Sequence, residues 1–549
     1  MTTLWHPVRR SSAADLRANG PKIPQVTYVV IALGAAFAAF LRLYQLSRPG
    51  YLLGITEYDD GVYFGNALRL VNGAIPYRDF ALVHPPGSML LMAPVALLAK
   101  VTGSAWGLGI ARLLTVGADT ACVALLGVLV RHRGPVTAGV ACGVYAVYPD
   151  TLVAAHTLLL EPWLNLFCLA GATLVFDGDR ITGGRRLVWG GVAFGFAAAI
   201  KLWALVPLAV IVLLLMPRAR RAAAFAGGAL AGLGLPLLPF LILAPAGVID
   251  GVLVGQFVRS GAKHPPLLPR LTDLTGLSLF SSRPDRAAIL ILLAMAAVIV
   301  SGYLAAWLGA HRLPTALDGY AVIGLVVVTL MFMWPYGYYP HYGAFDGPFI
   351  TLSLALSVGL LASRPAKSLV AAVMVSLAAA VMIAGLGIRE FGAESHLHGW
   401  PLPAATADRL IPPGSCVMTD DPALTITADR FTSSTAGCPD MVDSYGTLIA
   451  MTDGRTSHAA PRTLNSVAAA WQSGFARARH VWLETGSQGQ IPWTHGLYEY
   501  FSNHFRLIGL ASIHPGRKNV PRGGLYIQRQ EYPQGAKPPH DSSPHSWPA

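Results

Sequence analysis

The stretch that decides the interpretation of this chain is Glu57-Tyr58-Asp59-Asp60-Gly61-Val62-Tyr63, followed by Val83-His84-Pro85-Pro86-Gly87. Both segments are irregular in pattern, and they follow an apolar run long enough to cross a bilayer. Nowhere else in the sequence do two adjacent carboxylates lie so close to a predicted span. We therefore expect any chemistry that the protein performs to centre on this acidic pair.

The composition is that of a membrane protein. Of 549 residues, 54% are hydrophobic and 12% are charged, whereas soluble domains carry about 25% charged residues. A net charge of +12 would suggest nucleic acid in a soluble protein, but the basic residues lie in short clusters between apolar runs, as in cytoplasmic loops. The fold class expected is thus a polytopic α-helical membrane protein with no nucleic-acid partner. No cleavable signal peptide is evident before the first apolar run.

Apolar runs of about 20 residues predict eleven spans. Nine of them are 26–45, 106–130, 134–150, 157–176, 222–244, 287–309, 317–334, 346–363 and 368–387. The run 187–216 is interrupted by Lys201 and is interpreted as two short spans that meet at one membrane face. The apolar run 87–101 is too short for a span, and we expect a re-entrant or interfacial helix there.

The basic residues predict the orientation. They cluster at Arg9, Arg10 and Arg17, at 131–133, at Arg180, Arg185 and Arg186, at 218–221, at 311–312, and at Arg364 and Lys367. Eleven spans with a cytoplasmic N-terminus place all of these clusters inside. This topology places on the outer side of the cell membrane the segments 46–105, 245–286 and 388–549.

These patterns divide the chain into four parts. Residues 1–25 form a cytoplasmic segment, 26–387 the transmembrane domain with its first outer loop 46–105, 388–529 a small extracytoplasmic α/β domain, and 530–549 a disordered tail. In the α/β domain the pattern predicts strands at 416–418, 480–483 and 524–528, and helices at 466–478 and 497–510. Cys416 and Cys438 could form a disulfide there if the domain lies outside the cytoplasm.

Several charged residues are candidates for chemistry on the outer face. Asp59 and Asp60 could act as a general base and as its orienting or metal-binding partner, or they could end a solvated loop and cap a helix. Glu161 is an intramembrane carboxylate and a functional candidate by default. Lys201 could bind a phosphate, or could extend its amine to the membrane interface.

Aromatic and basic side chains could complete a binding site on the same face. Tyr339, His341 and Tyr342 belong to an aromatic segment that could bind a sugar or lipid, or form an interfacial belt. Arg259, in the outer loop 245–286, adds positive charge for an anionic ligand, and His84 belongs to the first loop. Carboxylates beside a cation near the lipid boundary suit group transfer from a lipid phosphate.

With these residues in place, the chain resembles the GT-C glycosyltransferases. It is similar to the branch that contains protein O-mannosyltransferases, lipid A aminoarabinose transferases and related actinobacterial enzymes. The resemblance covers about residues 26–387. It rests on the first loop 57–87, Leu160-Glu161-Pro162-Trp163, Ile200-Lys201-Leu202 followed by Pro207, and Tyr339-Pro340-His341-Tyr342.

The resemblance implies an enzyme that takes a sugar from a polyprenyl-phosphate donor outside the cytoplasmic membrane. By position, Asp59 matches the family's catalytic acidic residue, which the resemblance implies is the base for the acceptor hydroxyl, while Glu161 matches a second acidic residue of the cavity and Lys201 a residue near the donor phosphate. Asp60 stands where many members have Glu. Pro85 stands where the aminoarabinose branch has Lys, so that phosphate contact must come from elsewhere.

Three functions are consistent with these features of the sequence. The favoured one is a glycosyltransferase with a glycan, lipid or protein acceptor, in contact with membrane lipids. A transporter or lipid flippase, or a non-catalytic scaffold or sensor, would share the hydrophobic pattern. Mannose and arabinose donors both fit. A divalent cation held by Asp59 and Glu161 is a further hypothesis.

Overall fold

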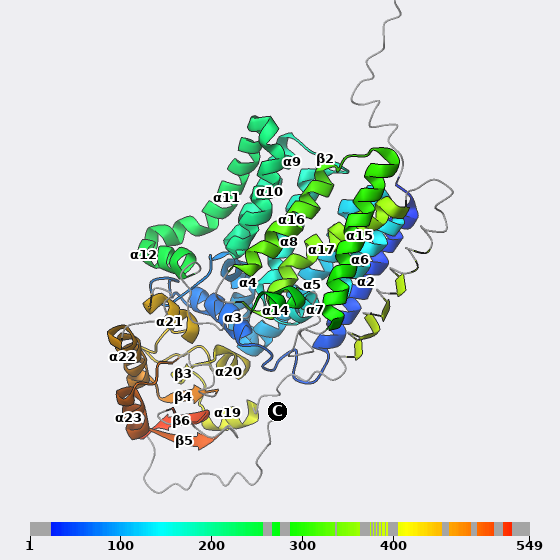
Figure 1. Cartoon of the computed structure of the whole chain (residues 1–549). Helices are drawn as coiled ribbons and strands as arrows, with labels where there is room; N and C mark the ends of the chain where they lie inside the picture. The colour runs from blue at the N-terminus through cyan, green and yellow to red at the C-terminus, as the bar shows by residue number, and fades with distance from the viewer. Residues whose placement is uncertain are drawn as a thin grey trace, which may run out of the picture.

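The computed structural model describes residues 23–255, 266–274, 286–334, 338–362, 404–452, 461–484, 491–509 and 520–529, with single positions between 374 and 392. A bundle of long helices and a small sheet-containing domain make up the molecule (Figure 1). The predicted segment 1–25 lies almost wholly outside the described residues, and so do the tail 530–549 and most of the span 368–387.

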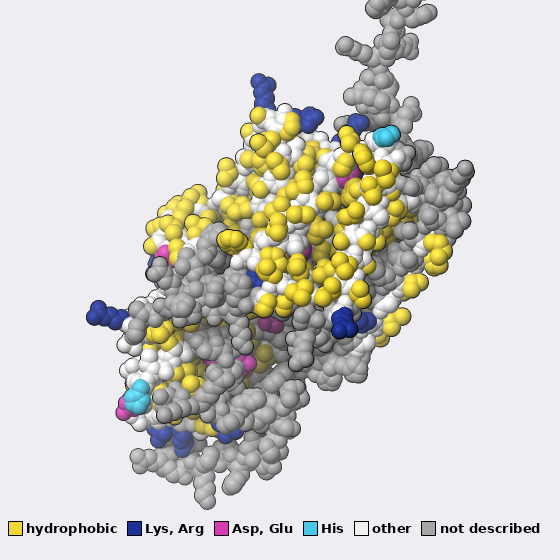
Figure 2. Space-filling view, viewed as in Figure 1, with side chains coloured by type: hydrophobic (Ala, Val, Ile, Leu, Met, Phe, Trp, Pro, Cys, Tyr) yellow, Lys and Arg dark blue, Asp and Glu magenta, His cyan; other side chains and the backbone are white. Residues whose placement is uncertain are grey.

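The helical bundle follows the predicted apolar runs closely. Its helices are α2 (Gln25–Leu46), α5 (Ser104–Val130), α6 (Pro135–Ala146), α7 (Pro149–Ala155), α8 (Leu160–Val175), α9 (Gly184–Ile200), α10 (Leu205–Leu215), α11 (Ala219–Leu243), α12 (Pro245–Ile249), α14 (Leu267–Asp273), α15 (Arg286–Ala310), α16 (Ala316–Met333) and α17 (Gly343–Ala362). Hydrophobic side chains cover the visible flank of the bundle (Figure 2). A surface of this kind suits contact with lipid.

Six helices among the described residues are long and apolar enough to cross a membrane. A seventh is possible if α6 and α7, bent by 59° to one another, form one broken span. The sequence predicted a single span at 134–150, but Pro149 starts the new helix α7 and the chain changes direction there. The total of eleven spans stays a prediction.

Glycines allow α9 and α11 to pack with their backbones in close approach. A Cβ atom on Gly195 would lie 2.0 Å from the carbonyl oxygen of Ala229, and one on Gly232 would lie 2.1 Å from that of Val192. Small residues in such pairs are typical of helix association in membranes, where close van der Waals packing replaces the hydrophobic effect. The packing of α9 on α11 thus supports the helix that ends at Ile200, directly before Lys201.

A cluster of charges joins three connecting segments at the end of the bundle away from the sheet. Arg133 pairs with Asp179, and at 2.9 Å with Asp318, while Arg312 lies 3.2 Å from Asp179. Asp179 lies in the turn between the short strands β1 (Phe176–Asp177) and β2 (Arg180–Ile181). Two of the predicted inner basic clusters, 131–133 and 311–312, therefore meet at Asp179.

The first loop is more ordered than its sequence suggests. The acidic stretch is the start of a 14-residue helix, α3 (Tyr58–Val71), and not an irregular segment. After a turn, α4 (Gly87–Thr102) follows, as the short apolar run predicted. The two helices pack against one another through Phe64 of α3 and Ala99 of α4, both next to Gly107 of α5.

The C-terminal domain, residues 404–529, contains a four-stranded sheet in the order β3-β4-β6-β5. Its strands are β3 (Val417–Thr419), β4 (His480–Leu483), β5 (Phe505–Gly509) and β6 (Gly524–Gln528), and its helices are α19 (Ala404–Leu410), α20 (Pro422–Thr427), α21 (Ser444–Met451), α22 (Pro461–Arg477) and α23 (His495–His504). The predicted helix 497–510 is wrong in its second half, because β5 pairs antiparallel with β6 there. Tertiary pairing overrides the helical pattern of a short segment.

A disulfide links Cys416, at the start of β3, to Cys438, as the sequence allowed. It closes a loop that contains α20, with a sequence separation of 22 residues. Cross-linking a loop of this length removes conformational entropy from the unfolded chain.

Replacing both cysteines, as C416A/C438A, is expected to destabilise the C-terminal domain by about 3 kcal/mol in the chain-entropy model. Thermal unfolding of the purified protein in detergent, followed by tryptophan fluorescence, measures the change. An unchanged unfolding curve for the double variant would show that the disulfide contributes nothing to the stability of the domain.

Candidate functional site

Helix α3 presents three faces to three different surroundings. Successive residues of a helix are turned by about 100°, so residues three or four positions apart share a face. Asp60 and Phe64 face α5, while Gly61 and Gly65 face the C-terminal domain. Asp59 lies on a third face with Tyr63. The two adjacent carboxylates therefore point into different environments.

Asp60 is buried in an ion pair with Arg112 of α5, and both side chains are 0% exposed. Its Oδ2 atom accepts hydrogen bonds from Arg112 Nη2 at 2.6 Å and from Thr56 Oγ1 at 2.6 Å. Its Oδ1 atom accepts one from the backbone N–H of Leu158. The interpretation of this carboxylate as a solvated loop end is therefore wrong, and both of its oxygens are engaged in holding the fold.

Breaking this pair from one side is expected to cost about 3–5 kcal/mol of stability, because it leaves an uncompensated buried charge. R112L and D60N should each lower the thermal midpoint and the yield of folded protein. The exposed pair of Arg78 and Asp79 provides the control, and R78A should leave the midpoint unchanged. A wild-type midpoint in R112L would contradict the role assigned to the pair.

Glu161 and Lys201 form the second charged pair of the site. Lys201 Nζ donates a hydrogen bond to Glu161 Oε1 at 2.8 Å, and both side chains are almost fully buried. The ammonium group also lies 3.4 Å from the ring centre of Trp203 and 4.8 Å from that of Tyr342. Aromatic faces stabilise a cation by their quadrupole. Glu161 Oε2 is buried and has no hydrogen-bond partner among the described residues.

The break in the helix at Lys201 determines where the ammonium group of this residue lies. Helix α9 ends at Ile200, and Lys201 follows with extended backbone before a short 3₁₀ turn. A cation is favoured at a helix C-terminus by the helix dipole. The bounds of α9 and α10 confirm the predicted interruption at Lys201, while the assignment of the two helices as separate spans stays a prediction.

The first loop runs beside this break. A Cβ atom on Gly87 would lie 2.5 Å from the carbonyl oxygen of Ala199, so the start of α4 packs directly on the end of α9. His84 precedes this contact, and its ring meets the ring of Tyr63 edge to face, with centres 5.9 Å apart. The loop thus brings His84 between α3 and the Lys201 segment.

Tyr63 connects the two acidic positions. Burial raises the pKa of its hydroxyl well above the usual value, and the negative charges of Asp59 and Glu161 raise it further. Tyr342 and Asp443 add to the same effect. The Tyr63 hydroxyl therefore experiences the negative charges of both Asp59 and Glu161. The described residues offer this hydroxyl no hydrogen-bond partner.

The aromatic segment that contains Tyr339, His341 and Tyr342 packs beside Lys201. The His341 ring stacks on Tyr339 with centres 5.7 Å apart and meets Tyr342 edge to face at 5.1 Å. Burial, with a contribution from Lys201, lowers the pKa of His341 to about 4, against the opposing effect of Glu161. His341 is therefore neutral at pH 7 and can act as a hydrogen-bonding group but not as a cation.

Two sequence predictions are not supported by described contacts. Arg259 lies outside the described residues, so its assignment stays a prediction. The described residues also contain no group of three or more His, Cys, Asp or Glu side chains placed to hold a metal ion. Glu161 already faces the ammonium group of Lys201. The hypothesis of a divalent cation held by Asp59 and Glu161 therefore stays a prediction.

Sequence reasoning missed Arg112 and Trp203. Arg112 falls inside the apolar run 106–130, where an ionisable side chain is itself a signal of a buried partner. The same signal marks Arg42 and Asp119, which form another buried pair at 2.5 Å between α2 and α5. Trp203 gave no comparable signal, because an aromatic residue in an apolar run is ordinary.

No family model and no curated protein sequence matches this chain. Its fold is shared by solved structures, among them ArnT from Cupriavidus metallidurans bound to undecaprenyl phosphate, with a TM-score of 0.57 and 14% identity over 91% of this chain and 97% of that chain. The apo state of the same protein gives a TM-score of 0.55 at 15% identity, over 90% of this chain and 97% of that one. The Archaeoglobus fulgidus oligosaccharyltransferase, in complex with Zn and sulfate, gives 0.50 at 12%, over 90% of this chain and 73% of that one.

At such low identities the likeness establishes the fold alone. It confirms the predicted fold class, a polytopic α-helical membrane protein with a small C-terminal α/β domain, and shows that this fold is shared with these structures.

Proposed function

We propose that this protein is an integral-membrane glycosyltransferase that transfers a sugar from a polyprenyl-phosphate donor to a hydroxyl group of a cell-envelope glycan, lipid or protein. The proposal is supported by the buried Glu161–Lys201 pair with the rings of Trp203 and Tyr342, by the packing of the first loop on the helix end beside Lys201, and by a fold shared with ArnT bound to undecaprenyl phosphate. A base, a cation and an aromatic wall in one place are what such a transfer requires.

In this proposal Asp59 is the general base. It takes the proton of the acceptor hydroxyl as that oxygen forms its bond to the anomeric carbon. The bond between that carbon and the phosphate oxygen breaks, and polyprenyl phosphate leaves. Asp60 acts through the fold and not on the substrate, because both of its oxygens are held by protein groups.

Lys201 faces the donor phosphate in this scheme. Its charge stabilises the phosphate that leaves, while Glu161 and the rings of Trp203 and Tyr342 hold the ammonium group in position. His84, which contacts Tyr63, and Tyr339 and His341, which pack on Tyr342, are assigned to substrate binding. A neutral His341 suits a sugar hydroxyl better than an anion.

The proposal also fixes an orientation. The charge cluster around Asp179 lies at the end of the bundle that we assign to the cytoplasm, and the C-terminal domain lies at the other end (Figure 1). A disulfide in that domain supports an oxidising compartment, outside the cell membrane. The donor, the acceptor and the first loop would then meet on the outer face.

D59N is expected to reduce sugar transfer at least ~100-fold, because it removes the base without changing the size of the side chain. The assay uses membranes with a panel of radiolabelled polyprenyl-phosphate sugars, with mannose and arabinose donors included, and follows label into product. Donor binding by the variant should match the wild type. Wild-type turnover in D59N would rule out the assigned base, and movement of donor without a new glycosidic bond would favour a flippase.

Replacing Lys201 should weaken donor binding. K201M alone leaves Glu161 buried without its cation, so the matched variant is E161Q/K201M, which neutralises both partners together. Both variants are expected to bind polyprenyl phosphate at least ~10-fold more weakly than the wild type, because a charge-assisted contact is lost. Binding is measured by thermal-shift titration with undecaprenyl phosphate. Wild-type affinity in the double variant would remove Lys201 from the donor site.

A further inference from the structure

The C-terminal domain makes its most extensive polar contacts with one helix of the membrane part, α3. Along α3, Tyr58, Gly61, Gly65 and Arg69 recur at intervals of three or four residues and form one stripe that faces this domain. Asp59 lies next to this stripe in the sequence and on a neighbouring face of the helix.

The first turn of α3 has little to hold it from within. Its N-cap residue, Glu57, makes no side-chain hydrogen bond to the turn, so its backbone N–H groups lack the usual cap. A helix end of this kind frays unless other contacts fix it. Asp59 is the second residue of α3, so its position depends on contacts that come from outside the helix.

Tyr58 supplies such a contact at the start of α3. Its hydroxyl donates to Asp443 Oδ1 at 2.8 Å and accepts from the backbone N–H groups of Ser444 at 3.1 Å and Tyr445 at 3.4 Å. These are first-turn groups of α21, which otherwise lack helical partners. The phenol oxygen therefore caps α21 and fixes the first turn of α3 at the same time.

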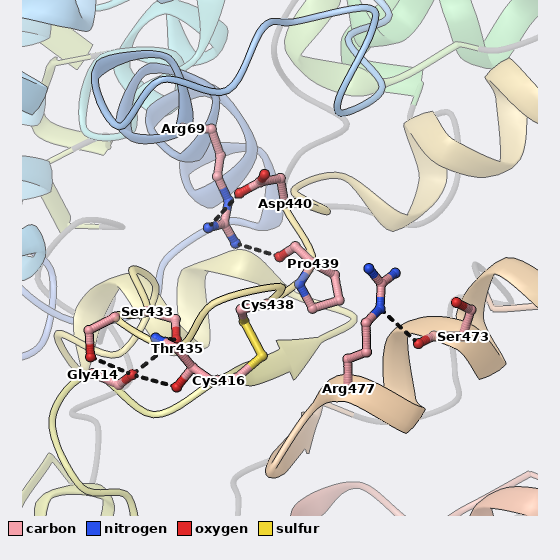
Figure 3. Close-up of a disulfide and its surroundings, with 11 residues drawn as sticks. Arg69, Gly414, Cys416, Ser433, Thr435, Cys438, Pro439, Asp440, Ser473 and Arg477 are labelled. Carbon is pink, nitrogen blue, oxygen red and sulfur yellow. Dashed lines mark hydrogen bonds and ion pairs between the residues drawn. A yellow bond between two sulfur atoms is a disulfide. The ribbon is translucent and has the colours of Figure 1, made fainter.

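Arg69 supplies the contact at the other end. Its Nη2 donates to the carbonyl oxygen of Pro439 at 3.3 Å, and its Nη1 lies 3.3 Å from Asp440 Oδ1 (Figure 3). Its guanidinium group also lies 4.4 Å from the ring centre of Phe431. Only 7% of Arg69 is exposed, whereas the side chain of Asp440 is 43% exposed, so the buried guanidinium group reaches its ion-pair partner at the surface.

The partners of Tyr58 and Arg69 belong to one short segment, 439–445, that begins at the disulfide. Cys438 precedes Pro439 directly and is bonded to Cys416 beside the sheet (Figure 3). Between the two ends, a Cβ atom on Gly61 would lie 2.2 Å from the backbone nitrogen of Ala423 in α20. The domain thus holds α3 at both ends and touches its backbone in the middle.

We propose that the C-terminal domain positions the catalytic helix, with Tyr58 and Arg69 at the two ends of α3 as the positioning residues that connect the segment 439–445 to Asp59. This inference rests on the proposed function, because it assigns Asp59 the role of base. Neither positioning residue touches substrate. Each acts on turnover by keeping the Asp59 carboxylate at the distance that proton transfer requires.

The first test removes only the Tyr58 hydroxyl. Y58F keeps the ring and is expected to lower kcat at least ~10-fold, since small displacements of a reacting group have large effects on rate. KM for the donor should change less than about twofold, since the Lys201 site is untouched. D443N should show the same loss, and Y58F/D443N no further loss, because both changes remove one connection.

The control is Y526F, which removes a hydroxyl bonded to the Arg522 carbonyl oxygen within the same domain, away from α3. It should leave kcat and KM unchanged. Hydrogen exchange of the backbone N–H groups of residues 58–63 should quicken in Y58F and not in Y526F, with the thermal midpoint of both close to the wild type. If kcat falls in proportion to the thermal midpoint in both Y58F and Y526F, the role of Tyr58 is merely structural and the proposal is overturned.

A packing variant keeps the proposal testable if Y58F folds poorly. A Cβ atom on Gly65 would lie 2.8 Å from Val442 Cγ1, so G65A pushes the segment 439–445 away from α3. It should lower kcat, and G65A/V442A, which makes room for the new methyl group, should recover part of the loss. Unchanged kcat in G65A, or no recovery in the double variant, would count against positioning by this segment.

Failure of the inference can be told from failure of the proposed function by assaying D59N in parallel. If D59N is inactive while Y58F and G65A turn over normally, the base assignment stands and the positioning role is wrong. If D59N itself turns over normally, the proposed base is wrong, whatever the positioning variants do.

Discussion

The structure depends first on the buried ion pair of Arg112 and Asp60. The single guanidinium group of Arg112 donates to the Asp60 carboxylate and to the carbonyl oxygens of Tyr51, Leu52 and Gly54. The chain that enters α3, the helix itself and the spanning helix α5 are thereby fixed to one another. A buried charge without its partner is strongly unfavourable, so this arrangement has few alternatives.

This constraint determines what the neighbouring carboxylate can do. With Asp60 directed at Arg112, the turn of the helix directs Asp59 about 100° away, to the face of α3 that carries Tyr63. The remaining face of α3 is left for the C-terminal domain, and the glycines at 61 and 65 allow that domain to approach the backbone. One short helix thus connects the membrane bundle, the candidate base and the C-terminal domain.

The second half of the site depends on an interruption in a helix. Because α9 stops at Ile200, Lys201 can turn inward to Glu161 and to the ring of Trp203. The start of α4 at Gly87 packs on the same interruption. The candidate donor site and the candidate base are therefore held by contacts between the first loop and the bundle, so a change in either is expected to affect both.

The sequence by itself predicted most of the long apolar helices, the helix break at Lys201 and three strands of the C-terminal domain. Long apolar runs, and a charged residue within such a run, are local features that can be recognised without the tertiary structure. It also allowed the disulfide, because the two cysteines lie in a polar region. It did not predict β5, whose strand form depends on pairing with β6.

Only the tertiary structure showed that Asp60 is held in a buried ion pair while Asp59 lies on a different face of α3. The two residues are chemically alike and adjacent, and what distinguishes them is a cation 52 residues away from Asp60 in the sequence. Likewise, Tyr58 and Arg69 acquire their partners from residues more than 300 positions away. Contacts at such separations leave no periodic pattern in the chain, because they depend on how folded elements meet and not on local conformation.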